Sequence, residues 1–461
     1  MAFNLIEDDE ADPGAVPIAV LSKAGLEAWR ESAPARERDW AAATGFTGEP
    51  GKLALVPDKA GKLGRVLVGA SEDEATMWAL AGLSENLPEG NYRLEQGPGG
   101  GDPTRIALGW ALGTYSFTLY REKKEHRARL VWPEGADRGL AERLASAICL
   151  ARDLINTPAS DLGPAELAEA AVVVAENAGA KHRVITGDGL LAENYPTIHA
   201  VGRASSRAPR LVDISWGEER APKVTLVGKG VCFDSGGLDL KSASGMRMMK
   251  KDMAGAAIML GLAQAVMAGK LPVRLRVLLP LVENAVSGNA MRPLDIVKTR
   301  KGITVEIGNT DAEGRLILCD TLAEAATETP AMLVDAATLT GAARVALGPE
   351  LPALFCNDDA LAAGLIANGA AEDDPLWRMP LWRPYRKLID SKAADINNVS
   401  ESPHAGAITA ALYLQEFVEP GIPWAHLDVM AWNTRARPGR PEGAEAQTLR
   451  ALYAYIAGRF G

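Results

Sequence analysis

The stretch Val224–Lys241 reads VTLVGKGVCFDSGGLDLK and passes from an apolar run into a loop rich in glycine and charge. The run Val224–Gly228 is apolar at nearly every position, as in strands that are covered on both faces. Lys229, Asp234 and Lys241 follow directly, on a segment that its glycines make conformationally free. In open α/β sheets, the groups that carry out chemistry lie just beyond the carboxyl ends of the strands. The stretch therefore predicts a covered sheet with a functional site at its edge.

Strand and helix patterns alternate through the rest of this part of the chain. They predict helices at 166–178, 254–269 and 314–327, and further strands at 183–185, 210–215, 273–279 and 332–336. Apolar strands separated by helices indicate a mixed or parallel sheet with helices on both faces. The uncharged run Met253–Gly269 falls short of the roughly 20 apolar residues that cross a bilayer. We therefore expect a buried helix there and no membrane contact.

The pattern divides the chain into three parts. In residues 1–135, short apolar runs alternate with a helix-like stretch at 72–83, which indicates a small N-terminal α/β domain. Apolar residues at helical spacing, ended by a Thr-Pro pair, predict a connecting helix over residues 136–156. Residues 157–461 then form a C-terminal α/β domain with a mixed sheet. The length of 461 residues fits this division, at about 150 residues per domain.

Composition narrows the classes of function. The chain has 49 Lys and Arg against 59 Asp and Glu, a net charge of −10, which gives no broad basic surface for nucleic acid or anionic lipid. Its four cysteines form no CxxC pair, so they predict neither a disulfide framework nor a cysteine-based zinc site. The first ten residues lack the features of a secretory signal. We therefore expect a cytoplasmic protein with no nucleic-acid partner.

Three segments carry carboxylates beside basic residues. Asp234 lies in the stretch quoted above, Asp252 in MKKDMAGAA, and Asp311 and Glu313 in NTDAEGRL, which also contains Arg315. Asp252 directly precedes an alanine-rich helix, so an N-cap is an equally good interpretation of that residue. Asp311 and Glu313 are two residues apart and would point to the same side of an extended segment.

Four carboxylates in one cleft need compensating charge. Two of them 4 Å apart repel by roughly 4 kcal/mol at an effective dielectric constant of about 20. Basic residues could neutralise them in plain ion pairs, such as one between Lys229 and Asp234, or two divalent metal ions could bridge them. The five histidines are scattered and form no HExxH motif, which disfavours a histidine-based zinc site. Spacing alone leaves both interpretations of the carboxylates open.

The carboxylate motifs resemble those of the leucyl aminopeptidase family, the cytosol aminopeptidases of family M17. The resemblance rests on VGKGVCFDSGG (227–237), MKKDMAGAA (249–257), NTDAEGRL (309–316), DAATLTGAA (335–343) and His426–Asp428, with a lean toward the peptidase B branch in NNVSES (397–402). It implies that residues 157–461 form a catalytic peptidase domain. It also implies a dimetal aminopeptidase that removes Leu, Met and similar N-terminal residues from peptides with a free N-terminus.

The resemblance also implies a set of metal ligands for two divalent ions, zinc or manganese. Asp234 and Glu313 would bridge both ions, and Asp311 would complete the more exchangeable site. Lys229 and Asp252 would complete the tighter site, and Asp252 would also bind the α-amine of the substrate. A water shared by both ions would be the nucleophile.

The remaining roles follow from the same resemblance. Lys241 would stabilise the developing oxyanion, and Arg315 would hold a bicarbonate that acts as general base. Met249, Thr338 and Gly341 would form the pocket for the first side chain, although Met249 is equally well interpreted as a core residue. The family assembles as homohexamers, which the composition neither supports nor contradicts.

Two other classes of function compete with the aminopeptidase. Carboxylate-bridged metals also serve phosphoryl transfer, so a dimetal phosphoesterase is one alternative. A DNA-binding accessory factor is the other, because some relatives of this family bind DNA. The net charge of −10 disfavours it.

Overall fold

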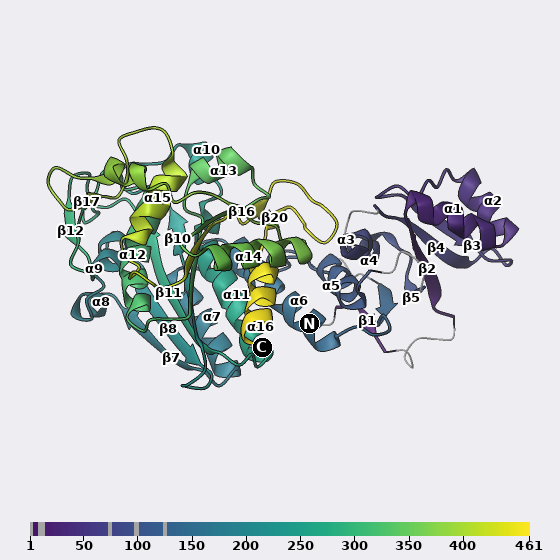
Figure 1. Cartoon of the computed structure of the whole chain (residues 1–461). Coiled ribbons are helices and arrows are strands. Elements are labelled where there is room, and N and C mark those ends of the chain that lie inside the picture. Colours follow the sequence, from purple (N-terminus) through teal and green to yellow (C-terminus); the bar gives the residue numbers. More distant parts are fainter. Residues whose placement is uncertain (1–2, 8–13, 72–75, 96–100, 123–126) are drawn as a thin grey trace. The chain divides into compact units, whose positions relative to one another are not determined.

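The computed structural model describes residues 3–7, 14–71, 76–95, 101–122 and 127–461 (Figure 1). The chain forms two compact units, Met1–Cys149 with Arg435–Glu442 and Leu150–Thr434 with Gly443–Gly461. Helix α6 (Arg138–Asn156), where the sequence predicts a connecting helix, carries the chain from the first unit into the second. The helix predicted at 72–83 is described only as α3 (Thr76–Ala81), and residues 72–75 lie outside the described ranges.

The first unit is a small α/β fold, as predicted. Its described strands form one sheet in the order β1-β6-β5-β2-β4-β3, in which only β3 pairs antiparallel with its neighbour. The strands are β1 (Leu5–Ile6), β2 (Val16–Leu21), β3 (Leu53–Pro57), β4 (Leu63–Gly69), β5 (Gly90–Leu94) and β6 (Ala128–Val131). The other helices are α1 (Lys23–Ser32), α2 (Ala35–Ala43), α4 (Leu83–Asn86) and α5 (Pro103–Gly113).

The second unit contains the main sheet and most of the helices. The sheet consists of β7 (Lys181–Thr186), β8 (Arg210–Trp216), β9 (Lys223–Gly228), β10 (Gly230–Asp234), β11 (Arg274–Asn284), β14 (Met332–Ala337), β15 (Ala353–Cys356), β16 (Trp377–Arg378) and β18 (Trp424–Asp428). The helices are α7 (Pro164–Asn177), α8 (Gly189–Ala192), α9 (Pro196–Gly202), α10 (Ala243–Met246), η1 (Met249–Met253), α11 (Ala254–Ala268), α12 (Glu313–Ala326), α13 (Gly341–Leu347), α14 (Asp359–Ala371), η2 (Arg383–Ile389), α15 (Gly406–Gln415) and α16 (Leu449–Phe460). Short strands β12 (Ile296–Lys298), β13 (Thr304–Glu306) and β17 (Ile396–Asn397) form a small sheet, and β19 (Trp432–Asn433) pairs with β20 (Gly443–Ala444).

The centre of the main sheet is parallel. Strands β10, β11, β9, β14 and β18 run in one direction, whereas β8 and β15 pair antiparallel with their neighbours β11 and β18. The carboxyl ends of the parallel strands therefore meet at one edge. This mixed sheet confirms the prediction, and its strands lie within a few residues of the predicted ones except that β11 extends to Asn284.

Helices cover both faces of the main sheet (Figure 1). Helices α7, α11 and α16 pack on one face, and α9, α12 and α15 pack on the other. Helix α11 is buried along nearly its whole length, as the uncharged run predicts. No helix within the described ranges is both long enough and apolar enough to cross a bilayer.

Glycines bring α11 close to the strands beneath it. A Cβ atom at Gly255 would lie 2.0 Å from the carbonyl oxygen of Ala336 in β14, and one at Gly228 would lie 2.5 Å from the Cα of Ala256. Real side-chain atoms do not approach backbone this closely, so only glycine permits this packing. The close approach holds the start of α11, just after Asp252, against the carboxyl edge of the sheet.

The substitution Gly255→Ala should destabilise the protein, because overpacking of a tight core costs about 1–3 kcal/mol. A matched control is Gly458→Ala in α16, where the new methyl group would meet nothing within 4 Å. The control should be neutral or stabilising by up to about 1 kcal/mol, since alanine favours helices over glycine. Urea unfolding of both variants measures the difference. Equal stability of Gly255→Ala and wild type would contradict the packing described here.

Candidate functional site

The predicted site residues lie at the carboxyl edge of the main sheet. Lys229 follows β9, Asp234 ends β10 and Thr338 follows β14. Glu313 is the first residue of α12, and Asp252 lies in η1 directly before α11. These segments are distant in sequence, and the parallel strands bring them together.

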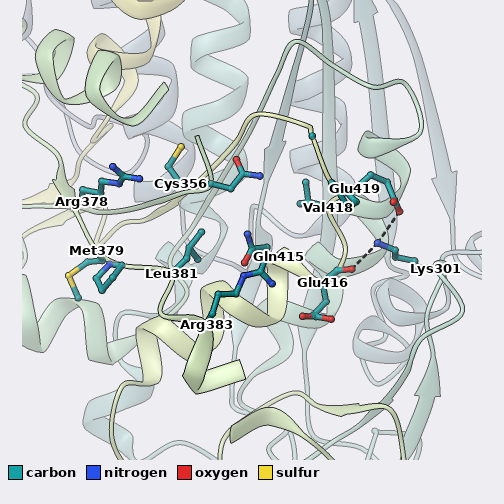
Figure 2. A pocket seen from close by; sticks show the side chains of 14 residues that line it. Lys301, Cys356, Arg378, Met379, Leu381, Arg383, Gln415, Glu416, Val418 and Glu419 are labelled. Atoms are coloured by element: carbon teal, nitrogen blue, oxygen red, sulfur yellow. Dashed lines mark hydrogen bonds and ion pairs between the residues drawn. The ribbon is translucent and has the colours of Figure 1, made fainter. Parts of the chain in front are cut away.

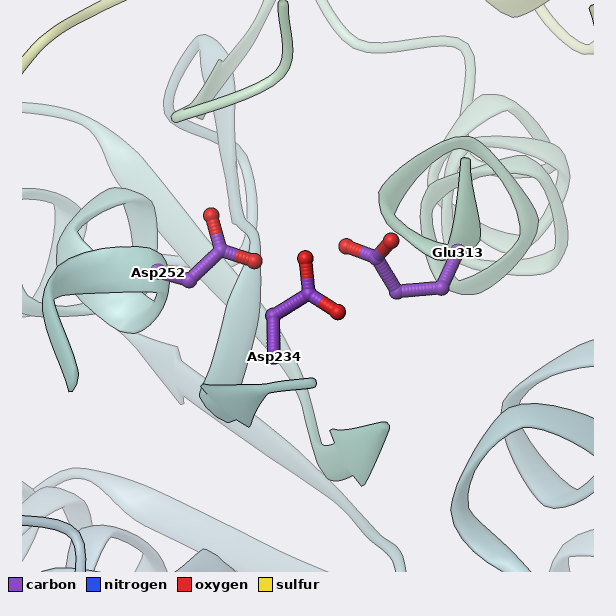
Figure 3. A group of neighbouring side chains, drawn as sticks. All are labelled: Asp234, Asp252 and Glu313. Atoms are coloured by element: carbon purple, nitrogen blue, oxygen red, sulfur yellow. The ribbon is translucent and has the colours of Figure 1, made fainter. Parts of the chain in front are cut away.

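Three carboxylates form a buried cluster (Figure 3). Asp234, Asp252 and Glu313 are each at most 3% exposed, and each offers an oxygen within 4.8 Å of those of the other two. Figure 3 shows the three side chains reaching toward a shared space from a strand end, a short helix and a helix start. This arrangement is chemically suited to binding divalent cations, which prefer carboxylate oxygens.

Two lysines neutralise the carboxylates in pairs. The Nζ atom of Lys229 lies 2.8 Å from Asp252 Oδ2 and 2.8 Å from Glu313 Oε1, so its ion pairs are with these two residues and not with Asp234. The Nζ atom of Lys241 lies 2.9 Å from Asp234 Oδ2 and also pairs with Asp311 Oδ1. Lys241 thus links Asp311 to the three buried carboxylates.

The site still holds more negative charge than its lysines compensate. Burial raises the pKa of Glu313 well above its usual value, and Asp234 raises it further against the opposing effect of Lys229. Burial and the neighbouring Asp234 raise the pKa of Asp311 to about 6. Burial alone lowers the pKa of Lys229, but Asp252 and Glu313 outweigh it, so the pKa of the ammonium is raised. Burial is the first cause of the two raised carboxyl pKa values, and the second cause, the neighbouring charge of Asp234, is one that an additional cation in the site would relieve.

A second observation supports metal binding. The buried Oε2 atom of Glu313 has no hydrogen-bond partner among the described residues. A buried carboxylate oxygen without a donor is unfavourable, and a metal ion is one of the few partners that remove the cost. The residues present therefore fit a metal centre.

Neighbouring polar groups orient the carboxylates. The Thr338 hydroxyl donates to Asp252 Oδ1 over 2.7 Å, and the Thr338 carbonyl accepts from Lys229 Nζ over 3.0 Å. The Asn284 side chain donates to Asp234 Oδ1 over 2.9 Å. Sequence patterns could not identify Asn284, because nothing in them shows that the end of β11 adjoins the end of β10.

The structure excludes the N-cap interpretation of Asp252. The residue that caps α11 is Met253, and no side-chain cap bond is formed there. Asp311 and Glu313 do not lie on the extended segment that the sequence predicts. Residues 309–312 form a turn instead, in which Ala312 N donates to Asn309 O over 3.2 Å. Both side chains nevertheless line the same cavity.

Arg315 lies close behind the carboxylates on α12. It is only 8% exposed, and one terminal nitrogen donates to the carbonyl of Asn398. Its Nε atom has no acceptor among the described residues. A buried guanidinium with an unused donor is suited to holding a small anion.

All ten predicted site residues line one cavity of about 760 Å³. Its walls also include Met248, Met430 and Leu351, which the sequence analysis missed, and the loop after β14. Asp428 at the end of β18 fixes that loop, because it accepts from Leu339 N over 3.0 Å and from Thr340 N over 3.2 Å. The cavity thus has a charged end and an apolar wall.

A second cavity, of about 880 Å³, is larger but lacks this chemistry (Figure 2). Its lining includes Arg378, Arg383 and Cys356, together with Lys301, which is paired with Glu419 over 2.9 Å. None of the ten predicted site residues, all of which the structure describes, contributes to it. Volume alone therefore does not identify the functional site.

The fold and the buried carboxylates define a mixed α/β metallohydrolase, and comparison with known proteins makes this specific. Residues 149–453 match the cytosol aminopeptidase family, catalytic domain, and residues 16–133 match the M17 aminopeptidase N-terminal domain. The chain belongs to the M17 cytosol aminopeptidase family. It is a metallo-aminopeptidase, a hydrolase of the dimetal class that acts on peptides.

Individual relatives agree with this assignment. A probable cytosol aminopeptidase of Roseiflexus castenholzii is 41% identical over 365 residues, which cover 75% of this chain and 74% of the relative. The crystal structure of a cytosol aminopeptidase from Coxiella burnetii has a TM-score of 0.95 and 48% identity, and covers 99% of this chain and 100% of its own. The bottromycin maturation enzyme BotP in complex with Mn has a TM-score of 0.89 and 33% identity, with 97% and 100% coverage. These similarities give no support to a phosphoesterase or a DNA-binding factor.

The substitution Thr338→Val should weaken metal binding, because it removes the hydrogen bond that orients Asp252. Loss of a partner that orients a metal ligand typically costs about 10- to 100-fold in affinity. Thr338→Ser is the matched control, since it keeps the hydroxyl group. Metal content after dialysis against a series of buffered metal concentrations measures the change. Wild-type affinity in Thr338→Val would show that this hydrogen bond does not support the site.

Proposed function

We propose that five residues of the cavity hold two divalent ions, zinc or manganese. Asp234 and Glu313 would bridge the ions, Asp311 would complete the more exchangeable site, and Lys229 and Asp252 the tighter one. The observation that carries this proposal is the buried cluster of Asp234, Asp252 and Glu313 with an unpartnered oxygen at Glu313. Bound ions would neutralise the carboxylates that now raise the pKa of Lys229, which leaves its amine free to act as a ligand.

Lys241 is suited to stabilising the oxyanion of the reaction. The ions, when bound, supply an activated water nucleophile and polarise the peptide carbonyl. The Lys241 ammonium lies beside two of the carboxylates and is partly open to the cavity. Burial lowers its pKa, but Asp234 and Asp311 outweigh burial and raise it, so the group stays charged. A fixed cation beside the reacting carbonyl stabilises the charge that develops there.

Arg315 would hold a bicarbonate ion that serves as general base. Its buried Nε atom has no acceptor among the described residues, and the guanidinium lines the cavity beside Glu313. A guanidinium binds a planar oxyanion through paired hydrogen bonds. Bicarbonate so held would lie next to the metal ligands and could accept a proton.

Asp252 would bind the α-amine of the substrate, and this requirement restricts cleavage to the first residue. The side chain of that residue would lie among Met249, Thr338 and Gly341, all of which line the cavity. Met249 is half-buried there, which suits a pocket for Leu or Met. We assign the chain to the peptidase B branch of its family on NNVSES (397–402).

The organisation of the protein completes the proposal. We propose a homohexamer in the cytoplasm. Within each chain, residues 1–135 would form the N-terminal domain, 136–156 the connecting helix and 157–461 the catalytic peptidase domain.

Leucine p-nitroanilide should be hydrolysed by the purified protein, and treatment with EDTA should abolish the activity. Addition of manganese or zinc should restore it, because the nucleophile depends on the metal. The N-acetyl form of the same substrate is the control and should not be cleaved, since it lacks the free amine. Cleavage of both forms, or activity that survives metal removal, would contradict the proposal.

The variants Asp234→Asn and Glu313→Gln should lose metal and activity together, because each removes a bridging carboxylate. Lys241→Met should keep its metal and lose mainly kcat, by about 100-fold or more, as when an oxyanion donor is removed. Metal analysis and steady-state kinetics on the same preparations separate the two classes. Two metals per chain in both carboxylate variants would overturn the ligand assignment.

A further inference from the structure

Asn398 is a fully buried polar residue whose side chain has no part in the mechanism described so far. It directly follows β17, is 0% exposed and does not line the active-site cavity. Its side-chain amide makes four hydrogen bonds, all of them with the backbone of residues 308–312. This segment lies between β13 and α12 and contains Asp311, and Glu313 comes directly after it.

The four bonds use the whole hydrogen-bonding capacity of the amide. The Oδ1 atom accepts from Gly308 N over 2.8 Å and from Asn309 N over 3.2 Å. The Nδ2 atom donates to Asn309 O over 2.8 Å and to Ala312 O over 3.4 Å. A primary amide offers both acceptor positions and N–H donors, whereas a carboxylate of the same shape can only accept. Asparagine therefore fits this place better than aspartate does.

The backbone of Asn398 is itself held on two sides. Its N–H group donates to the carbonyl of Glu306 in β13 over 3.0 Å, and its own carbonyl accepts from the Arg315 guanidinium on α12. Strand β17, which ends just before it, pairs with β13. Asn398 is thus a fixed support beside the turn 309–312.

Asp311 is the metal-ligand candidate that most needs such a support. Its side chain is 32% exposed, whereas those of Asp234, Asp252 and Glu313 are at most 4% exposed. Its backbone is held through Asn309, because Asp311 N donates to Asn309 Oδ1 over 2.7 Å. Both backbone groups of Asn309 bind Asn398. The position of Asp311 therefore depends on Asn398.

We propose that Asn398 is a positioning residue of the metal centre, whose side chain holds the turn 309–312 so that Asp311 and Glu313 face the other carboxylates. The inference rests on the proposed function, in which Asp311 completes the more exchangeable site. Loss of the support should weaken that site first. The tighter site has two of its ligands, Lys229 and Asp252, outside the turn.

The test is the substitution Asn398→Asp, which keeps the accepting oxygen and places a second oxygen against two carbonyl groups. The manganese concentration that half-fills the more exchangeable site should rise by about 10- to 100-fold, as when other partners of metal ligands are removed. Metal analysis after dialysis against buffered manganese measures this. At saturating manganese, kcat for leucine p-nitroanilide should return to within a few fold of wild type, because Asn398 does not line the cavity.

Two further variants separate positioning from loss of stability. Asn398→Ser introduces no buried charge and should shift the manganese dependence in the same direction. Asn357→Asp is the matched control, because the Asn357 amide also joins two backbone groups, Trp424 N over 2.8 Å and Ile422 O over 2.9 Å, but lies outside the active-site cavity. It should bind manganese as wild type does, and urea unfolding of all three variants reports their stability.

The outcomes distinguish this inference from the proposed function. Wild-type protein that binds no manganese, or cleaves the substrate without it, would count against the proposed function. Wild type that binds two ions, with unchanged affinity in both Asn398 variants, would overturn the role of Asn398 alone. An equal loss of affinity in Asn357→Asp would overturn it as well, because the effect would then follow from stability. A loss of kcat in Asn398→Ser that saturating manganese does not restore would also contradict a positioning role.

Discussion

The mutual repulsion of buried carboxylates is the constraint on which the site depends. Asp234, Asp252 and Glu313 are almost inaccessible to water and close enough for one ion to contact all three. The repulsion in such a cluster is relieved by fixed positive charge or by a proton on one of the acids. The fold supplies fixed charge by placing a lysine after β9 and another on the glycine-rich loop after β10, each between two acids.

Backbone geometry makes the cluster possible. Parallel strands present their carboxyl ends at one edge, so residues separated by about a hundred positions come within hydrogen-bond distance. Lys229 and Thr338 occupy equivalent places after adjacent strands and meet at 3.0 Å. The glycines that let α11 lie against β14 bring Asp252 to the same edge. The close packing of α11 against the sheet is therefore also what places Asp252 beside the other carboxylates of the site.

Much of this could be predicted from sequence, and the exceptions have physical causes. The strand at 224–228 and the helix at 254–269 follow from apolar patterns, and the motifs identify the acids that converge. Patterns carry no information on which strands are neighbours, so the support of Asp234 by Asn284 was not predicted. Nor do they distinguish a capping Asp252 from one held by Thr338. Lys251 stands in a run of charged residues, and only the structure shows that it is buried in the cavity.

The pairing of each lysine with two acids has a consequence for the protein before it acquires metal. When all groups are ionised, the four carboxylates and two ammonium groups leave a net charge of about −2, whereas the carboxylates alone would carry −4. A folded interior with hydrogen-bonded neighbours tolerates the smaller charge far better. The chain can thus fold first and take up ions afterwards. Which ion the folded protein then holds depends both on the affinity of this oxygen-rich ligand set for each metal and on the availability of each metal in the cell.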